Sequence, residues 1–379
     1  MITPKTETEL SDIIRTANAP FRIRGGGTRP VGQMGDATPL STSALTGITL
    51  YEPGALTLVV RAGTALADVQ AALDAEGQCL AFEPMDHRGL LGSTGTPTIG
   101  GVIAANASGP RRIQTGAARD HLLGVRFVDG SGRVIKNGGR VMKNVTGYDL
   151  VKLMAGSWGT LGVLTELSLK VLPKSAATGV LLLEGLSDQT AIRALSMALG
   201  SPFEVTGAAH VQKGLDGAPV TMIRVEGSEA SIAYRAEQLR MRLADIGAFT
   251  LETDPERTRA GWGWVRDVAP FHDRKGDVWR VSVKPSDAPA LVAAVPGAEA
   301  LYDWGGGLIW LLVPEGCDAG VVRDPLVRLG GHATQIRGRA AQVFHPLPAP
   351  VTALQAGLRR RFDPRGLLNP GLMAQEQAA

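Results

Sequence analysis

Cysteine is scarce in this chain: of its 379 residues only Cys79 and Cys317 are cysteines. An iron–sulfur cluster normally needs four thiolates, so the chain cannot hold one by itself. Two cysteines also give no disulfide framework of the kind that stabilises small secreted domains. If the protein handles electrons, an organic cofactor must therefore carry them.

Long apolar runs and a strong net charge are absent as well. No stretch of eighteen apolar residues occurs, which predicts no membrane-spanning helix. Residues 1–7 lack the basic-then-apolar layout of a signal peptide, so we expect a cytoplasmic chain. The net charge of +3 is too small to indicate nucleic acid binding, and the basic run 359–361 fits a solvated helix face better than a binding patch.

Glycine, by contrast, is abundant. It makes up 48 of 379 residues, about 13%, against ~7% in average usage. The excess is local, with 16 glycines among the 74 residues from Gly89 to Gly162. Such a run indicates a backbone that turns sharply or that a large ligand approaches closely.

Residues 1–173 are predicted to mix strands and helices around these glycine turns. Helices are predicted over residues 7–18, 66–76 and 146–155. Strands are predicted over residues 21–24, 56–62, 125–129, 133–136 and 162–172. The sequence Gly-Ser-Gly at 130–132 indicates a hairpin between two of them.

Residues 174–345 are predicted to hold two related βαββαβ units side by side. The first comprises a strand at 180–184, a helix at 188–199, strands at 205–211 and 220–225, and a helix at 229–246. The second comprises a strand at 278–283, a helix at 286–294, strands at 300–304 and 308–313, a helix at 319–329 and a strand at 333–337. Residues 346–379 then form a helix, 351–362, and a turn-rich closing segment.

A first candidate site follows the strand at 21–24, where Arg24 precedes Gly25, Gly26, Gly27 and Thr28. Without Cβ atoms, successive backbone N–H groups can converge on a diphosphate, and the threonine adds a hydroxyl donor. A plain glycine-rich turn is the alternative. The pattern is not G-x-G-x-x-G, so a Rossmann NAD site is not expected.

A second candidate site begins a short helix. Most of its residues are small or carry a hydroxyl; the candidates are Gly95, Thr96, Pro97, Thr98, Gly100, Gly101, Asn106, Ser108 and Gly109. A helix start with free N–H groups favours phosphate, and a wall of small residues leaves a groove for a flat ring system. Close packing of helix on sheet would want small residues too.

Two weaker candidate sites follow. One surrounds Gly116 and Asp120, just before a strand; the neighbouring His121, taken alone, is better explained as structural. The other runs from the predicted helix at 146–155 through a glycine turn to Gly162 and Val163. Backbone groups of such turns can recognise an adenine or isoalloxazine edge, although each would also serve as an ordinary connection.

Together these four segments resemble the FAD-binding domain of the vanillyl-alcohol oxidase and para-cresol methylhydroxylase (PCMH) superfamily. The resemblance covers the first 173 residues, and the stretch 362–371, with Asn369, resembles the closing segment of its lactate and glycolate dehydrogenase branch. It implies an α+β fold: a two-subdomain PCMH-type FAD-binding domain (1–173), a substrate or cap domain of two ferredoxin-like units (174–345), and a C-terminal segment (346–379) returning to the FAD domain. It also implies that the residues of the four segments, and Asn369, surround FAD.

Within that branch the chain is most similar to the smaller FAD-binding subunit of bacterial glycolate dehydrogenase, often called glycolate oxidase. The resemblance implies oxidation of glycolate, a small 2-hydroxyacid, to glyoxylate. It implies two partners, a larger FAD-binding subunit and an iron–sulfur subunit, and is compatible with peripheral attachment to the inner face of the cell membrane through them. Two other functions stay open: a self-sufficient 2-hydroxyacid or alditol oxidase, and a non-catalytic flavoprotein subunit for assembly or electron relay.

Two departures from the superfamily matter. Many members carry a histidine after the glycine run and bond it to flavin; Thr28 cannot form that link, so we expect non-covalent FAD. Relatives that oxidise 2-hydroxyacids often hold a divalent ion through His-x-His and a glutamate. No two of the six histidines here are so close, so we expect no metal.

The catalytic groups are harder to predict. A hydroxyacid oxidase needs a cation for the carboxylate and a base for the hydroxyl proton. His332, Arg337 and Arg339 are weak candidates, although surface positions on the last strand of the second unit explain them better.

Overall fold

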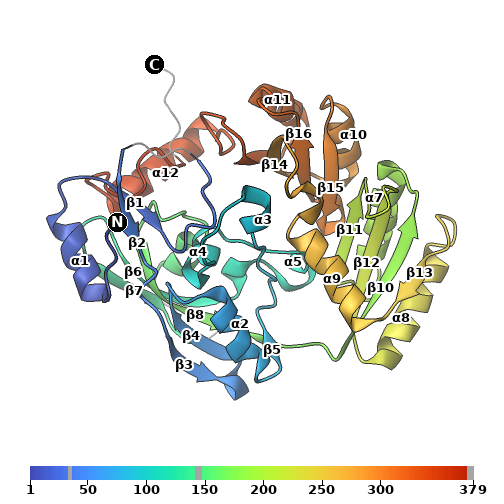
Figure 1. Ribbon diagram of the computed structural model, residues 1–379, viewed down its shortest axis with the longest axis horizontal. Helices are drawn as coiled ribbons and strands as arrows, with labels where there is room; N and C mark the ends of the chain where they lie inside the picture. Colours follow the sequence, from blue (N-terminus) through green and yellow to red (C-terminus); the bar gives the residue numbers. More distant parts are fainter. Residues whose placement is uncertain (33–35, 141–146, 374–379) are drawn as a thin grey trace.

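The computed structural model describes residues 1–32, 36–140 and 147–373 (Figure 1). A five-stranded antiparallel sheet, in the order β3-β4-β8-β6-β7, forms the centre of the first half. Its strands are β3 (Ile48–Glu52), β4 (Thr57–Arg61), β8 (Val163–Lys170), β6 (Leu122–Val128) and β7 (Val134–Gly138). The predicted hairpin at 130–132 joins β6 and β7.

One face of this sheet is covered by short helices. They are α2 (Leu66–Asp74), α4 (Ile99–Ala104) and α6 (Leu150–Met154), and with the sheet they enclose a core that includes Leu58, Val102, Phe127 and Leu167. The predicted helix at 146–155 is thus shorter, and position 146 lies outside the described residues. Two short strands, β5 (Gln78–Cys79) and β9 (Leu172–Pro173), pair at the edge of this layer.

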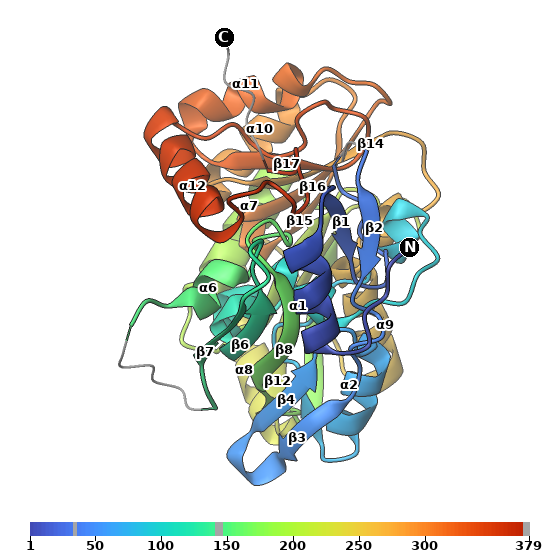
Figure 2. The same cartoon turned by 90° about the vertical axis from the view of Figure 1, so that its left-hand side faces the viewer.

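A second, smaller layer contains the chain's first elements. Helix α1 (Glu7–Thr16), capped by the Thr6 side chain, lies against β6, and β1 (Phe21–Arg24) pairs in parallel with β2 (Thr38–Ser41) (Figure 2). The other edge of β1 is closed by the end of the chain: the Phe21 N–H donates to the Leu367 carbonyl (2.7 Å), and the Asn369 N–H donates to the Phe21 carbonyl (3.0 Å). The closing segment after α12 (Ala349–Phe362) therefore covers the open edge of the small β1–β2 sheet.

The second half is built on one eight-stranded antiparallel sheet. Its first four strands are β10 (Ala177–Glu184), β11 (Gly207–Val211), β12 (Val220–Gly227) and β13 (Thr250–Glu252). The other four are β14 (Asp277–Ser282), β15 (Glu299–Asp303), β16 (Leu308–Val313) and β17 (His332–Arg337). Each set has its strands in the order fourth-first-third-second, and β11 pairs with β15 at the seam. The two predicted βαββαβ units are therefore confirmed.

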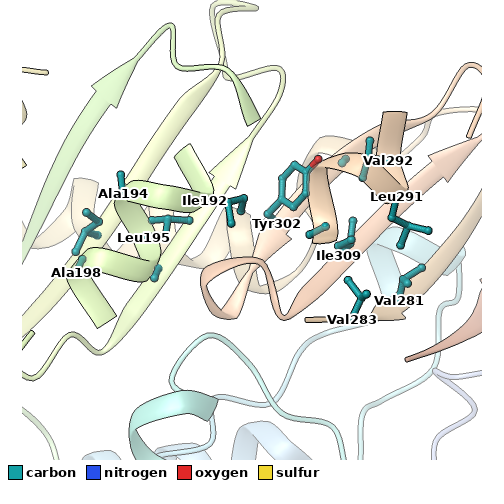
Figure 3. Packing of buried hydrophobic residues seen from close by; sticks show 14 of the residues in the cluster. Ile192, Ala194, Leu195, Ala198, Val281, Val283, Leu291, Val292, Tyr302 and Ile309 are labelled. Carbon is teal, nitrogen blue, oxygen red and sulfur yellow. The ribbon is translucent and has the colours of Figure 1, made fainter. Parts of the chain in front are cut away.

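Four helices cover one face of this sheet: α7 (Asp188–Leu199), α8 (Glu229–Arg242), α10 (Ala288–Ala293) and α11 (Ala319–Leu329). Ser187 caps α7, and the apolar side of the helix packs into the core. Figure 3 shows Ile192 of the first unit beside Tyr302 of the second, where the units meet. One continuous core thus joins both units.

The opposite face of the sheet packs toward the first half of the chain. Helix α9 (Pro255–Arg266) and the short α3 (Arg88–Leu91) lie in this layer, and the shared core includes Met85, Trp262 and Trp304. The sequence did not predict α9, because Gly261 and Gly263 weaken its helical pattern. Its start is fixed by Asp254, whose carboxylate accepts from the N–H groups of Glu256 (3.0 Å) and Arg257 (2.8 Å).

Candidate functional site

A cavity of about 320 Å³ lies between the loop after β1, the helix α4 and the turn before β8. Ten residues predicted from the sequence line it: Arg24, Gly25, Gly26, Gly27, Thr28, Thr98, Gly100, Gly101, Gly162 and Val163. Ala104, Ala105, Trp158 and Arg29 are among the other residues of the wall. The structure thus brings together parts of three of the four predicted segments.

The loop after β1 presents unpaired backbone donors to this cavity. Among the described residues, the N–H groups of Gly26, Gly27 and Thr28 have no hydrogen-bond partner. Gly27 has a φ of 75°, which turns the backbone in a way that favours glycine. Successive free N–H groups in a turn can hold an anion, and the role predicted for this loop stays a prediction.

Some glycines around the cavity serve packing. A Cβ on Gly26 would lie 1.6 Å from the Thr96 carbonyl oxygen, and a Cβ on Gly95 would lie 1.7 Å from the Gly26 carbonyl oxygen. These two loops therefore touch through their backbones, and any side chain there would separate them. Gly95 and Thr96 support the cavity wall from behind.

The start of α4 differs from the prediction of free N–H groups. The N–H of Ile99 donates to the Thr64 carbonyl (3.0 Å), that of Gly100 to the Ala62 carbonyl (2.8 Å), and that of Gly101 to the Thr98 hydroxyl (3.2 Å). The prediction was wrong because α4 begins beside the end of β4, whose turn supplies acceptors. What α4 offers the cavity is a wall of small residues.

The third predicted segment is bonded to the end of the second, and neither of these two stretches belongs to the described lining of the cavity. The Asn106 carboxamide accepts from the Arg119 N–H (3.0 Å), and the Ser108 hydroxyl accepts from the Ala118 N–H (2.9 Å). The Asp120 carboxylate accepts from the Ala117 N–H (2.8 Å), closing the turn at Gly116. Pro97 accepts from the Leu66 N–H (2.8 Å). A role of these residues toward a ligand stays a prediction.

Asn369 lies behind the cavity and ties its walls together. Its side-chain oxygen accepts from the Ile23 N–H (2.6 Å), and its side-chain amide donates to the Trp158 carbonyl (2.8 Å). Its φ of 46° is left-handed, which asparagine tolerates better than most residues. The closing segment thus links β1 to the turn before β8.

The three weak catalytic candidates have different surroundings. Arg337 donates to four backbone carbonyls, those of Leu90, Phe271, Gly276 and Arg274, at 2.8–3.0 Å, so its guanidinium joins segments of the fold. Arg339 is exposed. Burial, with the charges of Arg280, His345 and Arg112, lowers the pKa of His332, which favours the neutral imidazole near pH 7.

The boundary between the two halves contains arginines that the sequence did not single out. Arg224 pairs with Glu83 through two hydrogen bonds of 2.9 Å and stacks on Trp262 at 4.5 Å. Arg29, which lines the cavity, donates to the His87 imidazole (3.1 Å), and burial lowers the pKa of Arg29 to about 10. In the sequence, such arginines could have been noticed only where a charged residue interrupts an apolar strand, as Arg280 does in β14.

No group of three or more histidine, cysteine, aspartate or glutamate side chains suited to a metal occurs in the described part of the chain. Over the same residues, no helix combines the length and apolar character needed to cross a bilayer.

Comparison with known proteins defines the class first. Residues 1–138 match the family of FAD binding domains. The fold is shared with solved alkyldihydroxyacetonephosphate synthase, which aligns with a TM-score of 0.70 at 17% identity over 97% of this chain and 76% of that one. The chain is an FAD-dependent oxidoreductase.

A narrower relationship is found over the full length. Glycolate oxidase subunit GlcE of Escherichia coli (strain K12) is 36% identical over 94% of this chain and 93% of its own. The D-lactate dehydrogenase of Archaeoglobus fulgidus is 34% identical over 46% of this chain, and only 39% of that enzyme is spanned. The chain belongs to the family of glycolate oxidase subunit GlcE.

Proposed function

We propose that this chain is the FAD-binding subunit of a 2-hydroxyacid dehydrogenase complex that oxidises glycolate to glyoxylate. The observation that carries the proposal is the cavity after β1, where three consecutive backbone N–H groups lack partners beside a wall of small residues. The similarity to a glycolate oxidase subunit supports the choice of substrate.

The residues present fit FAD at this cavity. The N–H groups of Gly26, Gly27 and Thr28 would hold the diphosphate, and Arg24 lies beside them at the cavity wall. The small residues of α4 and the turn ending at Val163 leave room for a flat ring system. When bound, FAD supplies the hydride acceptor that the protein's own side chains lack.

Attachment of the cofactor is expected to be non-covalent. Thr28, the residue after the glycine run, is buried and cannot form the histidine link. No histidine, cysteine or tyrosine belongs to the described lining of the cavity. Denaturation should therefore release all flavin from the polypeptide, and yellow colour that stays with the denatured chain would contradict this.

We expect partner subunits because electrons taken from the substrate must be passed on by a relay that this chain lacks. With two cysteines, both free, the chain has no iron–sulfur relay of its own. We expect an iron–sulfur subunit and a larger FAD-binding subunit, and attachment to the inner face of the membrane would then run through them. The name of the GlcE relative, a subunit, is consistent with such a complex.

A charge placed in the cavity tests the proposal. Gly101 faces the lining, and its nearest neighbours to an added Cβ are side-chain atoms at 3.2 and 3.5 Å, so substitution there is tolerable. Gly101→Asp should repel the diphosphate, and Gly101→Asn is the neutral control of equal size. Flavin content and glycolate-dependent dye reduction are measured for the chain alone and with its partners.

The outcomes separate the three functions. Activity only in the complex, lost with Gly101→Asp and reduced less by Gly101→Asn, is the expected result, because the asparagine takes up the same space without the charge. Activity and oxygen uptake by the chain alone would indicate a self-sufficient oxidase. Activity of the complex that survives loss of flavin from this chain would indicate a non-catalytic subunit.

A further inference from the structure

We propose that Arg280 and Arg112, which both lie against the indole of Trp304, form the site that binds the carboxylate of the substrate. The inference rests on the proposed function, because that function supplies a small 2-hydroxycarboxylate as ligand. It adds the residues that recognise this ligand, which neither the sequence motifs nor the comparisons assign.

The two arginines come from opposite halves of the chain. Arg280 lies in β14 and Arg112 in the short helix α5 (Arg112–Thr115). Their guanidinium carbons are 5.2 and 4.9 Å from the centroid of the Trp304 ring. The ring itself is fixed, because its Nε1–H donates to the Gly109 carbonyl at 3.0 Å. Two cations from different halves of the chain therefore contact one rigid indole ring.

Neither cation is neutralised by the protein. Among the residues that the structure describes, no carboxylate lies within 4.0 Å of either guanidinium, and neither side chain makes a hydrogen bond. Other arginines at the same boundary are fully engaged: Arg224 pairs with Glu83, and Arg337 donates to four carbonyls. Ten N–H donors on Arg280 and Arg112 thus remain for a ligand, at about five per guanidinium.

Asp303, the acid whose charge acts on Arg280, is a poor counter-ion, and the acid whose charge acts on Arg112 is Asp120. Asp303 is buried, and its carboxylate accepts from the Trp304 N–H at 2.7 Å. Burial raises the pKa of Asp303 to about 7 despite the arginines around it. Because Arg280 keeps a pKa of about 10 although burial lowers it, the cluster carries net positive charge at neutral pH. An external anion would balance it.

The cluster continues toward the FAD cavity through Arg29 and His87. Arg29 lines the cavity and donates to His87, which burial and the charges of Arg29 and Arg280 keep neutral by lowering its pKa. His332 also has its pKa lowered by burial and by the same arginine, Arg280. Fixed cations beside neutral imidazoles suit a molecule that has a carboxylate next to a hydroxyl.

Oxalate, a small dicarboxylate that cannot be oxidised by hydride loss, is a suitable probe. Its dissociation constant is measured by calorimetry on the full chain loaded with FAD, for the wild type and for Arg280→Gln and Arg112→Gln. Loss of charge-assisted hydrogen bonds should weaken oxalate binding about tenfold or more in each variant. Arg280→Lys should restore part of the affinity, and this variant also serves if the glutamine variant fails to fold.

Arg274→Gln is the matched control, since Arg274 likewise stacks on an aromatic ring, that of Phe271 at 5.9 Å, but is paired with Glu299. It should bind oxalate as the wild type does. Unchanged oxalate affinity in both Arg280→Gln and Arg112→Gln, or binding of inorganic phosphate without binding of oxalate, would overturn the inference. A wild-type chain that holds no FAD would instead contradict the proposed function, and the oxalate titration tests the arginine site on that chain as well.

Discussion

Arg337 offers a direct test of whether a conspicuous arginine near the domain boundary is structural. Its guanidinium donates to carbonyls of α3 (Leu90), of the turn at Phe271 and of the loop before β14 (Gly276 and Arg274). Arg337→Met keeps much of the stem but removes every donor. Hydrogen bonds from a charged group are worth about 1.5–3 kcal/mol each, and some of these carbonyls are partly exposed. We therefore expect a loss of about 3 kcal/mol in the free energy of unfolding.

The measurement is urea unfolding of the FAD-loaded chain, followed by circular dichroism and by flavin fluorescence. Arg339→Met is the control, because Arg339 is exposed two residues away and its replacement should change stability by no more than about 0.5 kcal/mol. If Arg337→Met unfolds like the wild type yet the complex loses hydroxyacid oxidation, the structural reasoning is refuted and Arg337 returns as a catalytic candidate.

Three further predictions concern the boundary and the cavity. Asp303 has a pKa of about 7 in the folded protein, above its unfolded value, so the folded state binds more protons and the free energy of unfolding falls as pH rises toward 7. Asp303→Asn should remove this decline when unfolding is measured across pH. A variant whose stability falls with pH as steeply as that of the wild type would contradict the reasoning. Asn369→Gly keeps the left-handed backbone but loses two hydrogen bonds, so flavin affinity should fall about tenfold in fluorescence titrations, whereas Asn369→Ala should also unfold earlier. Gly95→Ala would place a Cβ 1.7 Å from the Gly26 carbonyl oxygen and should abolish flavin binding, whereas Gly54→Ala, where no atom lies within 4 Å of the added Cβ, should retain it.

Local signals predicted much of the second half. The helix Asp188–Leu199 has the predicted bounds, because Ser187 caps it and Gly200 follows its last turn. The strand Leu308–Val313 and the helix Ala319–Leu329 likewise match, and the repeated order of strands and helices indicated both βαββαβ units. Helix α9 was missed, since its glycines contradict its capping signal, and so was the short β13.

The candidate site was predictable only where one segment carries it. The loop Gly25–Thr28 carries its whole signal, a glycine run, in its own sequence, and it lines the cavity. The N–H groups of Ile99 and Gly100, predicted to be free, donate to carbonyls of the turn after β4, more than thirty residues earlier, and that of Gly101 donates to the Thr98 hydroxyl. Arg112 and Arg280 are 168 positions apart, and only the packing of the two halves on Trp304 brings them together. Sequence spacing predicts contacts only within one helix, strand or turn, so it could not predict this pair.

The bonds of β1 to Leu367 and Asn369 join segments that are synthesised far apart in time. During translation β1 emerges first, but its second edge stays open until Leu367 and Asn369 leave the ribosome. The strands of both antiparallel sheets are therefore synthesised before the segment that holds the outer edge of β1, next to the cavity. A chain truncated before Leu367 would therefore leave this edge of β1 open, and we expect it to hold FAD less tightly than the full chain.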